Sequence, residues 1–148
     1  MMTNLPGTLT LPGVGIFWPM ATLAFLTFAV LFALPLLRFR AVFIEKVRPS
    51  AFRYGDSDAV PDLARRVSRN FSNLTELPVL FYAVCVLALM FRQADATMIT
   101  LAWAYTGLRI AHSLIHVTFN HVLIRLAVFA TSAVVLMVMW IRLILALS

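Results

Sequence analysis

Four long apolar stretches constrain this chain more than any other feature of its sequence. They run from Val14 to Leu37, Val67 to Met90, Ala96 to Phe119 and Val122 to Leu147. A helix needs about 20 mostly apolar residues to cross the core of a bilayer. The chain is 62% hydrophobic and only 12% charged, whereas soluble domains are about 45–50% apolar. We therefore predict an all-α integral membrane protein, one domain over residues 1–148 that forms a bundle of four transmembrane helices.

The first apolar stretch does not have the residue order of an export signal. It follows the uncharged residues 1–12 and precedes Arg38 and Arg40. An export signal places its basic residues before the apolar run. We therefore expect this stretch to be a retained first helix.

Basic residues crowd the connection between the first and second apolar stretches. They are Arg38, Arg40, Lys46, Arg48, Arg53, Arg65, Arg66 and Arg69, in a chain of net charge +6. Because loops rich in Lys and Arg stay on the cytoplasmic side of a membrane, we expect loop 38–66 to be cytoplasmic and both termini to lie outside. The expected location is a bacterial inner membrane. The same rule accounts for the positive charge, so we predict no nucleic-acid partner.

Polar stripes interrupt the second and third apolar stretches. The second carries Arg66, Arg69, Asn73 and Glu76, and the third carries Arg109, His112 and His116. Spacings of three and four residues place each set on one helix face. Since the second predicted helix starts in the cytoplasm and the third ends there, the two stripes lie at similar depth. Arg125, one turn into the fourth predicted helix, joins them.

These ionisable side chains need partners, because a charge near the bilayer centre costs at least about 2.5–3.5 kcal/mol on insertion scales. An ion pair between Glu76 and Arg109 would satisfy two of them and fix the register of the helices, which is a purely structural role. Arginines outnumber the single carboxylate within the predicted spans, and this surplus of positive charge indicates an anionic ligand. Lipid phosphate is the alternative anion, above all for Arg66 near the membrane surface.

The sequence gives little support for a metal site or a disulfide. Cys85 has no second cysteine to pair with, and we expect it to be a small buried side chain. His112 and His116 are four residues apart, but only His121 in the following turn accompanies them, so we predict no metal. The acidic group at residues 56–58 is typical of a turn or a helix start.

The combined spacing of the polar residues resembles the MAPEG superfamily, the membrane-associated proteins in eicosanoid and glutathione metabolism. The motifs are Arg66-x-x-Arg69-x-x-x-Asn73-x-x-Glu76-x-Pro78, Arg109-x-x-His112-x-x-x-His116 and Arg125, and the resemblance extends from Arg38 onward. It implies a homotrimer, similar to microsomal glutathione transferases, with glutathione bound at the subunit interfaces. The binding residues that it implies are Arg38, Arg66, Arg69, Asn73, Glu76, Arg109, His112, His116 and Arg125.

The resemblance also implies an activity, a glutathione transferase or peroxidase acting on small lipophilic electrophiles from the membrane. Cationic neighbours would stabilise the glutathione thiolate, with Arg125 and His116 as the implied catalytic residues. The chain departs from the family at His116 and Phe129, where catalytic members commonly carry tyrosine. The alternative is a non-catalytic membrane protein whose polar cluster binds anionic lipid or stabilises a trimer. A transporter or proton relay using Glu76 and His112 is weaker, because no broken-helix repeat is visible.

Overall fold

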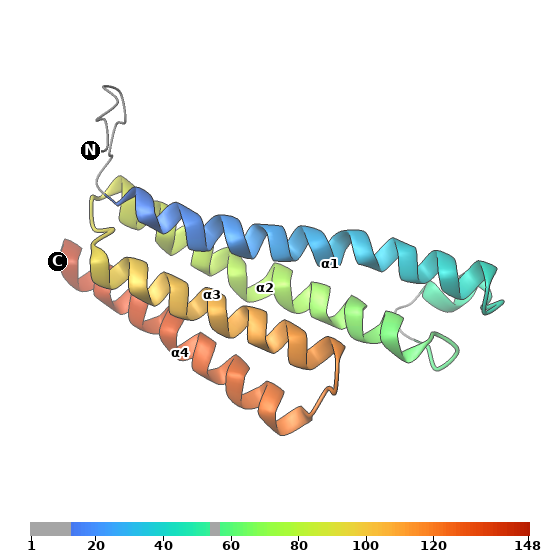
Figure 1. Cartoon of the computed structure of the whole chain (residues 1–148). Helices are drawn as coiled ribbons and strands as arrows, with labels where there is room; N and C mark the ends of the chain where they lie inside the picture. Colours follow the sequence, from blue (N-terminus) through green and yellow to red (C-terminus); the bar gives the residue numbers. More distant parts are fainter. Residues whose placement is uncertain (1–12, 54–56) are drawn as a thin grey trace, which may run out of the picture.

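The computed structural model of the chain describes residues 13–53 and 57–148, and this part contains four α-helices and no strand. The helices are α1 (Phe17–Phe43), α2 (Asp62–Met90), α3 (Ala96–Val117) and α4 (Val122–Leu147), with short 3-10 helices η1 (Val14–Ile16) and η2 (Pro49–Phe52). The α-helices lie lengthwise side by side (Figure 1). The start of α1 and the end of α4 lie at the same end of the bundle (Figure 1). The prediction of an all-α helical bundle is confirmed.

Three of the four helices are long and apolar enough to cross a membrane, namely the segments 14–43, 62–90 and 122–147. Among the described residues α3 does not meet this criterion, although its 22 residues would suffice in length. The reason is its polar stripe, because Arg109, His112 and His116 lower the mean hydropathy of the helix. All three of these side chains are buried inside the bundle. Four membrane-spanning helices were predicted, and the length and hydropathy of the helices support three of them, all except α3.

The helices extend beyond the predicted spans at the end of the bundle opposite the termini. Helix α1 continues to Phe43 rather than ending at Leu37, and α2 begins at Asp62 rather than Val67. Arg38 and Arg40 therefore lie in the last turns of α1 rather than in a loop. The apolar pattern ends where the hydrocarbon core would end, whereas the helical hydrogen bonds continue because arginine is a good helix former.

The connection between α1 and α2 contains η2 and a turn that precedes α2. The backbone N–H of Val60 donates to the carbonyl of Ser57 at 3.0 Å. Ser57 and Asp58 thus belong to a turn, as predicted, while Asp56 lies outside the described residues. Pro61 follows at the N-cap position of α2 and makes no side-chain capping hydrogen bond.

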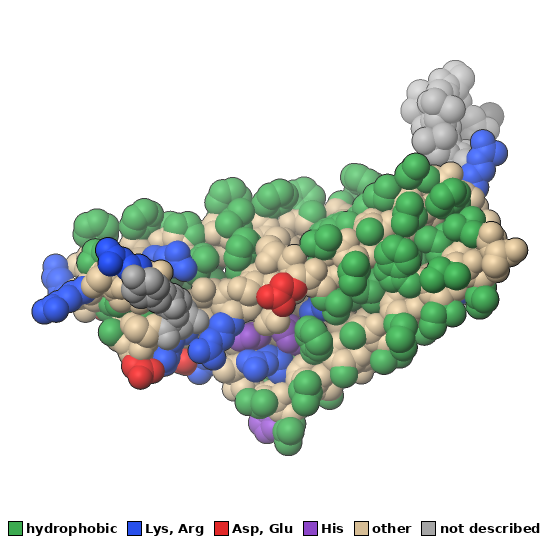
Figure 2. Space-filling view, turned by 180° about the vertical axis from the view of Figure 1, so that it is seen from behind, with side chains coloured by type: hydrophobic (Ala, Val, Ile, Leu, Met, Phe, Trp, Pro, Cys, Tyr) green, Lys and Arg blue, Asp and Glu red, His purple; other side chains and the backbone are tan. Residues whose placement is uncertain are grey.

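The interior of the bundle is filled by apolar side chains from all four helices. The rings of Phe81 on α2 and Tyr105 on α3 stack with their centroids 4.5 Å apart. The hydroxyl of Thr106 donates to the carbonyl of Pro19 at 3.2 Å and so joins α3 to α1. Many large apolar side chains instead cover the outside, as Figure 2 shows for one face. Phe25 on α1, for example, is 71% exposed. Such a surface suits contact with lipid rather than water.

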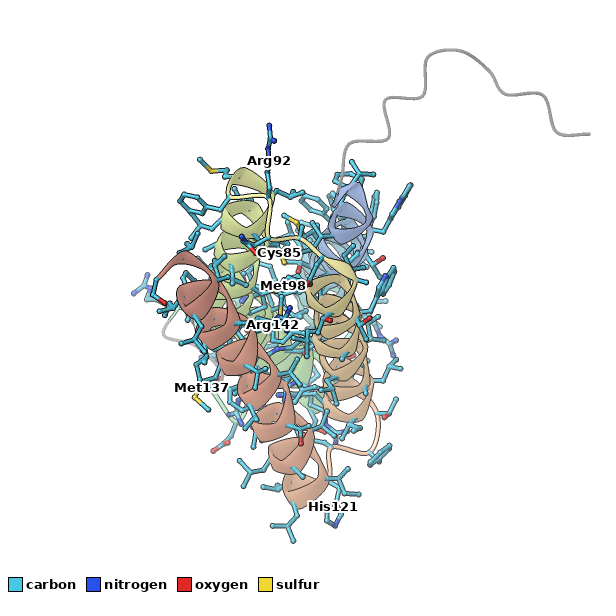
Figure 3. The ribbon with its side chains drawn as sticks, turned by 90° about the vertical axis from the view of Figure 1, so that its left-hand side faces the viewer. Cys85, Arg92, Met98, His121, Met137 and Arg142 are labelled. Atoms are coloured by element: carbon cyan, nitrogen blue, oxygen red, sulfur yellow. The ribbon has the colours of Figure 1, made fainter. Side chains whose placement is uncertain are left out.

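Asp95 joins three helices at the end of the bundle that carries the chain termini. Its carboxylate accepts a hydrogen bond from the backbone N–H of Met98 at 2.8 Å, which caps the start of α3. The other carboxylate oxygen lies 2.7 Å from the Nη2 atom of Arg142 near the end of α4. Figure 3 views this end of the bundle, with Met98 and Arg142 labelled. One side chain therefore fixes the turn between α2 and α3 and attaches α4 to it.

Replacing Asp95 tests both of these interactions. We expect Asp95→Ala to lower the free energy of unfolding by about 1–2 kcal/mol, since it removes the cap and the ion pair. Asp95→Asn retains an oxygen for the cap and should cost at most about 1 kcal/mol. Unfolding followed by circular dichroism in detergent measures the difference. Arg142→Ala is the matched control and should behave like Asp95→Asn. Equal losses for the two Asp95 variants would show that the cap contributes nothing.

Candidate functional site

Two polar pockets lie side by side near the turn between α3 and α4. The larger, of about 230 Å³, is lined by Asn73, His112, Val122, Arg125, Leu126 and Phe129 and is here called the helix-4 pocket. The smaller, of about 150 Å³, is lined by Asp62, Arg65, Arg66, Arg69, His116, Asn120 and Arg125 and is here called the arginine pocket. Figure 2 shows His side chains together with Lys or Arg side chains in a recess on one face. Arg125 lines both pockets and so forms the wall between them.

The guanidinium of Arg125 is held by two side chains from the preceding turn and helix. Its Nη1 atom donates to the Oδ1 atom of Asn120 at 2.5 Å. The same Nη1 atom lies 3.4 Å from the Nε2 atom of His116. Because arginine only donates hydrogen bonds, Nε2 must be the accepting, unprotonated nitrogen of the imidazole ring. His116 therefore contacts Arg125 as a neutral side chain.

Arg66 has a structural partner at each terminal nitrogen. Nη1 donates to the backbone carbonyl of Thr118, the residue that follows α3. Nη2 pairs with the carboxylate of Asp62, one turn earlier on α2. Arg66 thus ties the start of α2 to the end of α3 and satisfies a carbonyl that has no partner within its own helix. It shapes the arginine pocket while its own charge is offset by Asp62.

Arg109 is fully buried between α3 and α4 without an acidic partner among the described residues. Its Nε atom donates to the hydroxyl of Tyr105 at 3.1 Å. Its guanidinium carbon lies 5.3 Å from the centroid of the Tyr105 ring and 4.9 Å from that of the Phe129 ring. Aromatic faces attract cations, most strongly where water is excluded. Two rings therefore take the place of a counterion for Arg109.

The expected ion pair between Glu76 and Arg109 is wrong. Both Nη atoms of Arg109 lack a hydrogen-bond partner in residues 13–53 and 57–148, and Glu76 is exposed on the surface of α2. The spacing of the stripes places each residue on a face of its own helix, but the rotation of α3 turns Arg109 toward Phe129 on α4.

Most of the predicted site residues line the two pockets, and three do not. Asn73 and His112 line the helix-4 pocket, Arg66, Arg69 and His116 the arginine pocket, and Arg125 both. Neither Arg109 nor Glu76 is among the lining residues. Arg38 lies on α1 with its guanidinium carbon 5.7 Å from the Phe52 ring, also outside both pockets.

In the arginine pocket, three lining residues were missed in the sequence, namely Asp62, Arg65 and Asn120. Asp62 could have been found, because an acid four residues before Arg66 on a helix is a common ion-pair spacing. Asn120 gave no such signal, since its position depends on the shape of the turn between α3 and α4.

The part of the chain that the structure describes contains no group of three His, Cys, Asp or Glu residues suited to holding a metal. The rings of His112 and His116 lie 5.8 Å apart, centroid to centroid. His121 is exposed at the start of α4, at the lower end of that helix in Figure 3. The three histidines therefore do not converge.

The model of the MAPEG family matches residues 16–145, which is nearly the whole length. This chain belongs to the MAPEG family. No curated protein and no solved structure matches it.

Membership of the MAPEG family makes this a membrane protein of the glutathione and eicosanoid metabolism type. It also leads us to compare Phe129 with the tyrosine that catalytic members commonly carry at this position. The Phe129 ring lies 5.8 Å from the His112 ring and covers the guanidinium of Arg109. A phenol expected at this position of a catalytic MAPEG protein is here an apolar ring that shields a buried cation.

The network around Arg109 can be tested by removing one hydroxyl. Tyr105→Phe keeps the stacking on Phe81 but leaves the Nε–H of Arg109 without an acceptor. We expect a loss of about 1–3 kcal/mol in the free energy of unfolding, the usual cost of a buried unsatisfied donor. Chemical denaturation in mixed micelles measures it. Tyr82→Phe, at a half-buried position on α2, is the control, and a loss as large in that variant would contradict a special role for Tyr105.

Proposed function

We propose that this MAPEG protein binds glutathione in the two pockets and activates its thiol for attack on small lipophilic electrophiles. The observation that carries this proposal is the position of Arg125, which lines both pockets at once. A tripeptide lying across that wall would expose its thiol and its carboxylates to the same guanidinium. The resulting activity would be that of a glutathione transferase or peroxidase.

The charge of the arginine pocket supports an anionic ligand. Among the described residues, Arg65, Arg66, Arg69 and Arg125 line it together with the carboxylate of Asp62. Asp62 pairs with Arg66 and also lies 3.8 Å from Arg65. Arg65 also pairs with the carboxylate of Asp58 at 3.3 Å. The partners of Arg125 are instead the neutral side chains of Asn120 and His116, so the surplus of positive charge lies at Arg125. Glutathione, with two carboxylates, fits that surplus, and arginine binds carboxylates through paired hydrogen bonds.

The helix-4 pocket supplies the setting for the reaction. A free thiol has a pKa near 8.5 and is mostly protonated at neutral pH, while a neighbouring cation favours the thiolate. Arg125 is the cation of this pocket, and His112 also lines it. In the transferase reaction the thiolate sulfur forms a bond to an electrophilic carbon, and the electron pair moves to the leaving group. Leu126 and Phe129 give the pocket apolar walls that suit a lipophilic partner.

The assembly that we propose is a homotrimer in which all four helices cross the membrane. Helix α3 would cross with its polar residues turned inward, as its burial pattern allows. The basic end of the bundle would face the cytoplasm, with both chain ends on the outer side. Glu76 and Arg38 line neither pocket, and in a trimer they would be available to glutathione bound between neighbouring subunits.

A second candidate is a non-catalytic membrane protein whose arginine pocket binds the phosphate of an anionic lipid. The observation that favours it is the chemistry of positions 116 and 129, where an imidazole and a phenyl ring stand in place of two phenols. In this case glutathione would not be a ligand.

Arg125→Ala separates the two candidates. We expect parent protein in detergent to bind glutathione and to show thiolate absorbance in the ultraviolet, and the variant to lose at least about tenfold of that thiolate at neutral pH, because its main cation is gone. Difference absorbance together with calorimetry measures both quantities. Arg142→Ala removes an arginine from the far end of the same helix and should leave the signal intact. A parent that binds vesicles rich in anionic lipid but not glutathione would favour the second candidate.

Glu76→Gln tests the proposed role of an exposed carboxylate. Since Glu76 has no ion pair within the described chain, we expect the melting temperature to stay unchanged. Glutathione affinity should fall several-fold, because the carboxylate would no longer pair with the ligand's amino group. Calorimetric titration beside a thermal melt measures the two effects. Unchanged affinity would remove Glu76 from the site.

A further inference from the structure

Asn120 lies in the turn between α3 and α4 with a left-handed backbone. Its φ angle is 48°, a conformation that asparagine tolerates better than most residues. Its backbone N–H donates to the carbonyl of Ile115 at 2.8 Å, which closes the last turn of α3. The backbone of Asn120 is thus fixed by the end of the helix. The side chain is free to serve another purpose.

That side chain holds one corner of the Arg125 guanidinium. Its Oδ1 atom accepts from Nη1 at 2.5 Å, and the Nε2 atom of His116 lies 3.4 Å from the same Nη1. Among the described residues, neither Nε nor Nη2 of Arg125 has a partner. Because the guanidinium is planar and rigid, fixing Nη1 orients the remaining donors. Two of its edges are left for a ligand at the wall between the pockets.

The partners of Arg125 are neutral, which distinguishes it from two other arginines of the described chain. Arg66 pairs with the carboxylate of Asp62, and Arg142 pairs with that of Asp95. A carboxylate orients an arginine but also offsets its charge. An amide oxygen orients it and leaves the charge in place. This difference matters where the charge itself has to stabilise an anion.

We propose that Asn120 is a positioning residue that orients Arg125 toward the bound thiol without neutralising it. This inference rests on the proposed glutathione chemistry and adds to it a residue outside the MAPEG-like motifs of the sequence. A carboxylate at position 120 would still orient the guanidinium of Arg125 but would offset its positive charge. Glycine at position 120 would leave the charge of Arg125 in place but remove the side chain that orients its guanidinium. Both changes would weaken thiolate stabilisation for different reasons.

Two substitutions separate these effects. Asn120→Gly accepts the left-handed backbone at no steric cost and removes only the acceptor for Arg125. Asn120→Asp keeps an acceptor of nearly the same shape and adds a negative charge. Each variant is purified as the full chain in detergent beside the parent. Absorbance of the thiolate against pH gives the thiol pKa of bound glutathione. Affinity for S-hexylglutathione, which has no thiol, reports binding alone, and a thermal melt reports folding.

We expect both variants to retain the melting temperature. Asn120→Gly should bind S-hexylglutathione within about threefold of the parent, whereas Asn120→Asp should bind it more weakly, because its carboxylate lowers the positive charge of the arginine pocket. The thiol pKa of bound glutathione should rise by about one unit or more in each, roughly a tenfold loss of thiolate at neutral pH. A purely structural role would instead lower the melting temperature of Asn120→Gly and leave the thiol pKa unchanged.

Three results would overturn the proposal in whole or in part. If the parent and both variants lower the thiol pKa of bound glutathione equally, the role of Asn120 is overturned, whereas the proposed thiol activation stands. If Asn120→Asp alone kept the low thiol pKa, the requirement for a neutral partner would be wrong. A parent that binds S-hexylglutathione but does not lower the thiol pKa of glutathione would overturn the proposed thiol activation, and the role of Asn120 with it.

Discussion

The rest of this structure depends on the need of buried cations for partners inside an apolar bundle. Arg109 has no exposed surface, and isolated charges are costly at such positions. Arg109 is stabilised by the hydroxyl and ring of Tyr105 and by the ring of Phe129. These contacts fix how α3 faces α4. His112 and His116, one and two turns further along α3, are thereby directed toward the pockets beside α4.

The two pockets follow from the way in which α2 and α3 are joined near the α3–α4 turn. Arg66 bonds the carbonyl of Thr118 and the carboxylate of Asp62. It therefore acts as a structural residue of the arginine pocket. Arg125 enters the same space from α4, beyond a turn that Asn120 closes. Arg66 thus stabilises the pocket while its charge is offset by Asp62. Arg125 lies between the two pockets and has no acidic partner among the described residues.

The existence and type of all four helices follow from the apolar stretches, and so do both ends of α4. The end of α1 and the start of α2 lie beyond the apolar stretches and could not be predicted from them. The stripes also identify the lining residues that α2 and α3 contribute at Arg66, Arg69, Asn73, His112 and His116, because a spacing of three and four residues places side chains on one helix face. The pairing of Glu76 with Arg109 failed because that spacing does not determine how one helix is rotated against the next. Asn120 was missed for a related reason. Its importance comes from a left-handed turn conformation and a contact to Arg125 that only the folded backbone creates.

His116 and Phe129, at positions where tyrosine is common in catalytic members of the family, both lack the phenol hydroxyl that donates a hydrogen bond. A phenol can donate a hydrogen bond, whereas Phe129 donates none and places its ring on Arg109. His116, in the neutral form that accepts from Arg125, presents an acceptor rather than a donor to that guanidinium. Any anion at the wall between the pockets would then depend on the donors of Arg125 itself. The orientation of a single guanidinium, and the neutrality of the groups that hold it, therefore carry more weight here than in a site with two phenols.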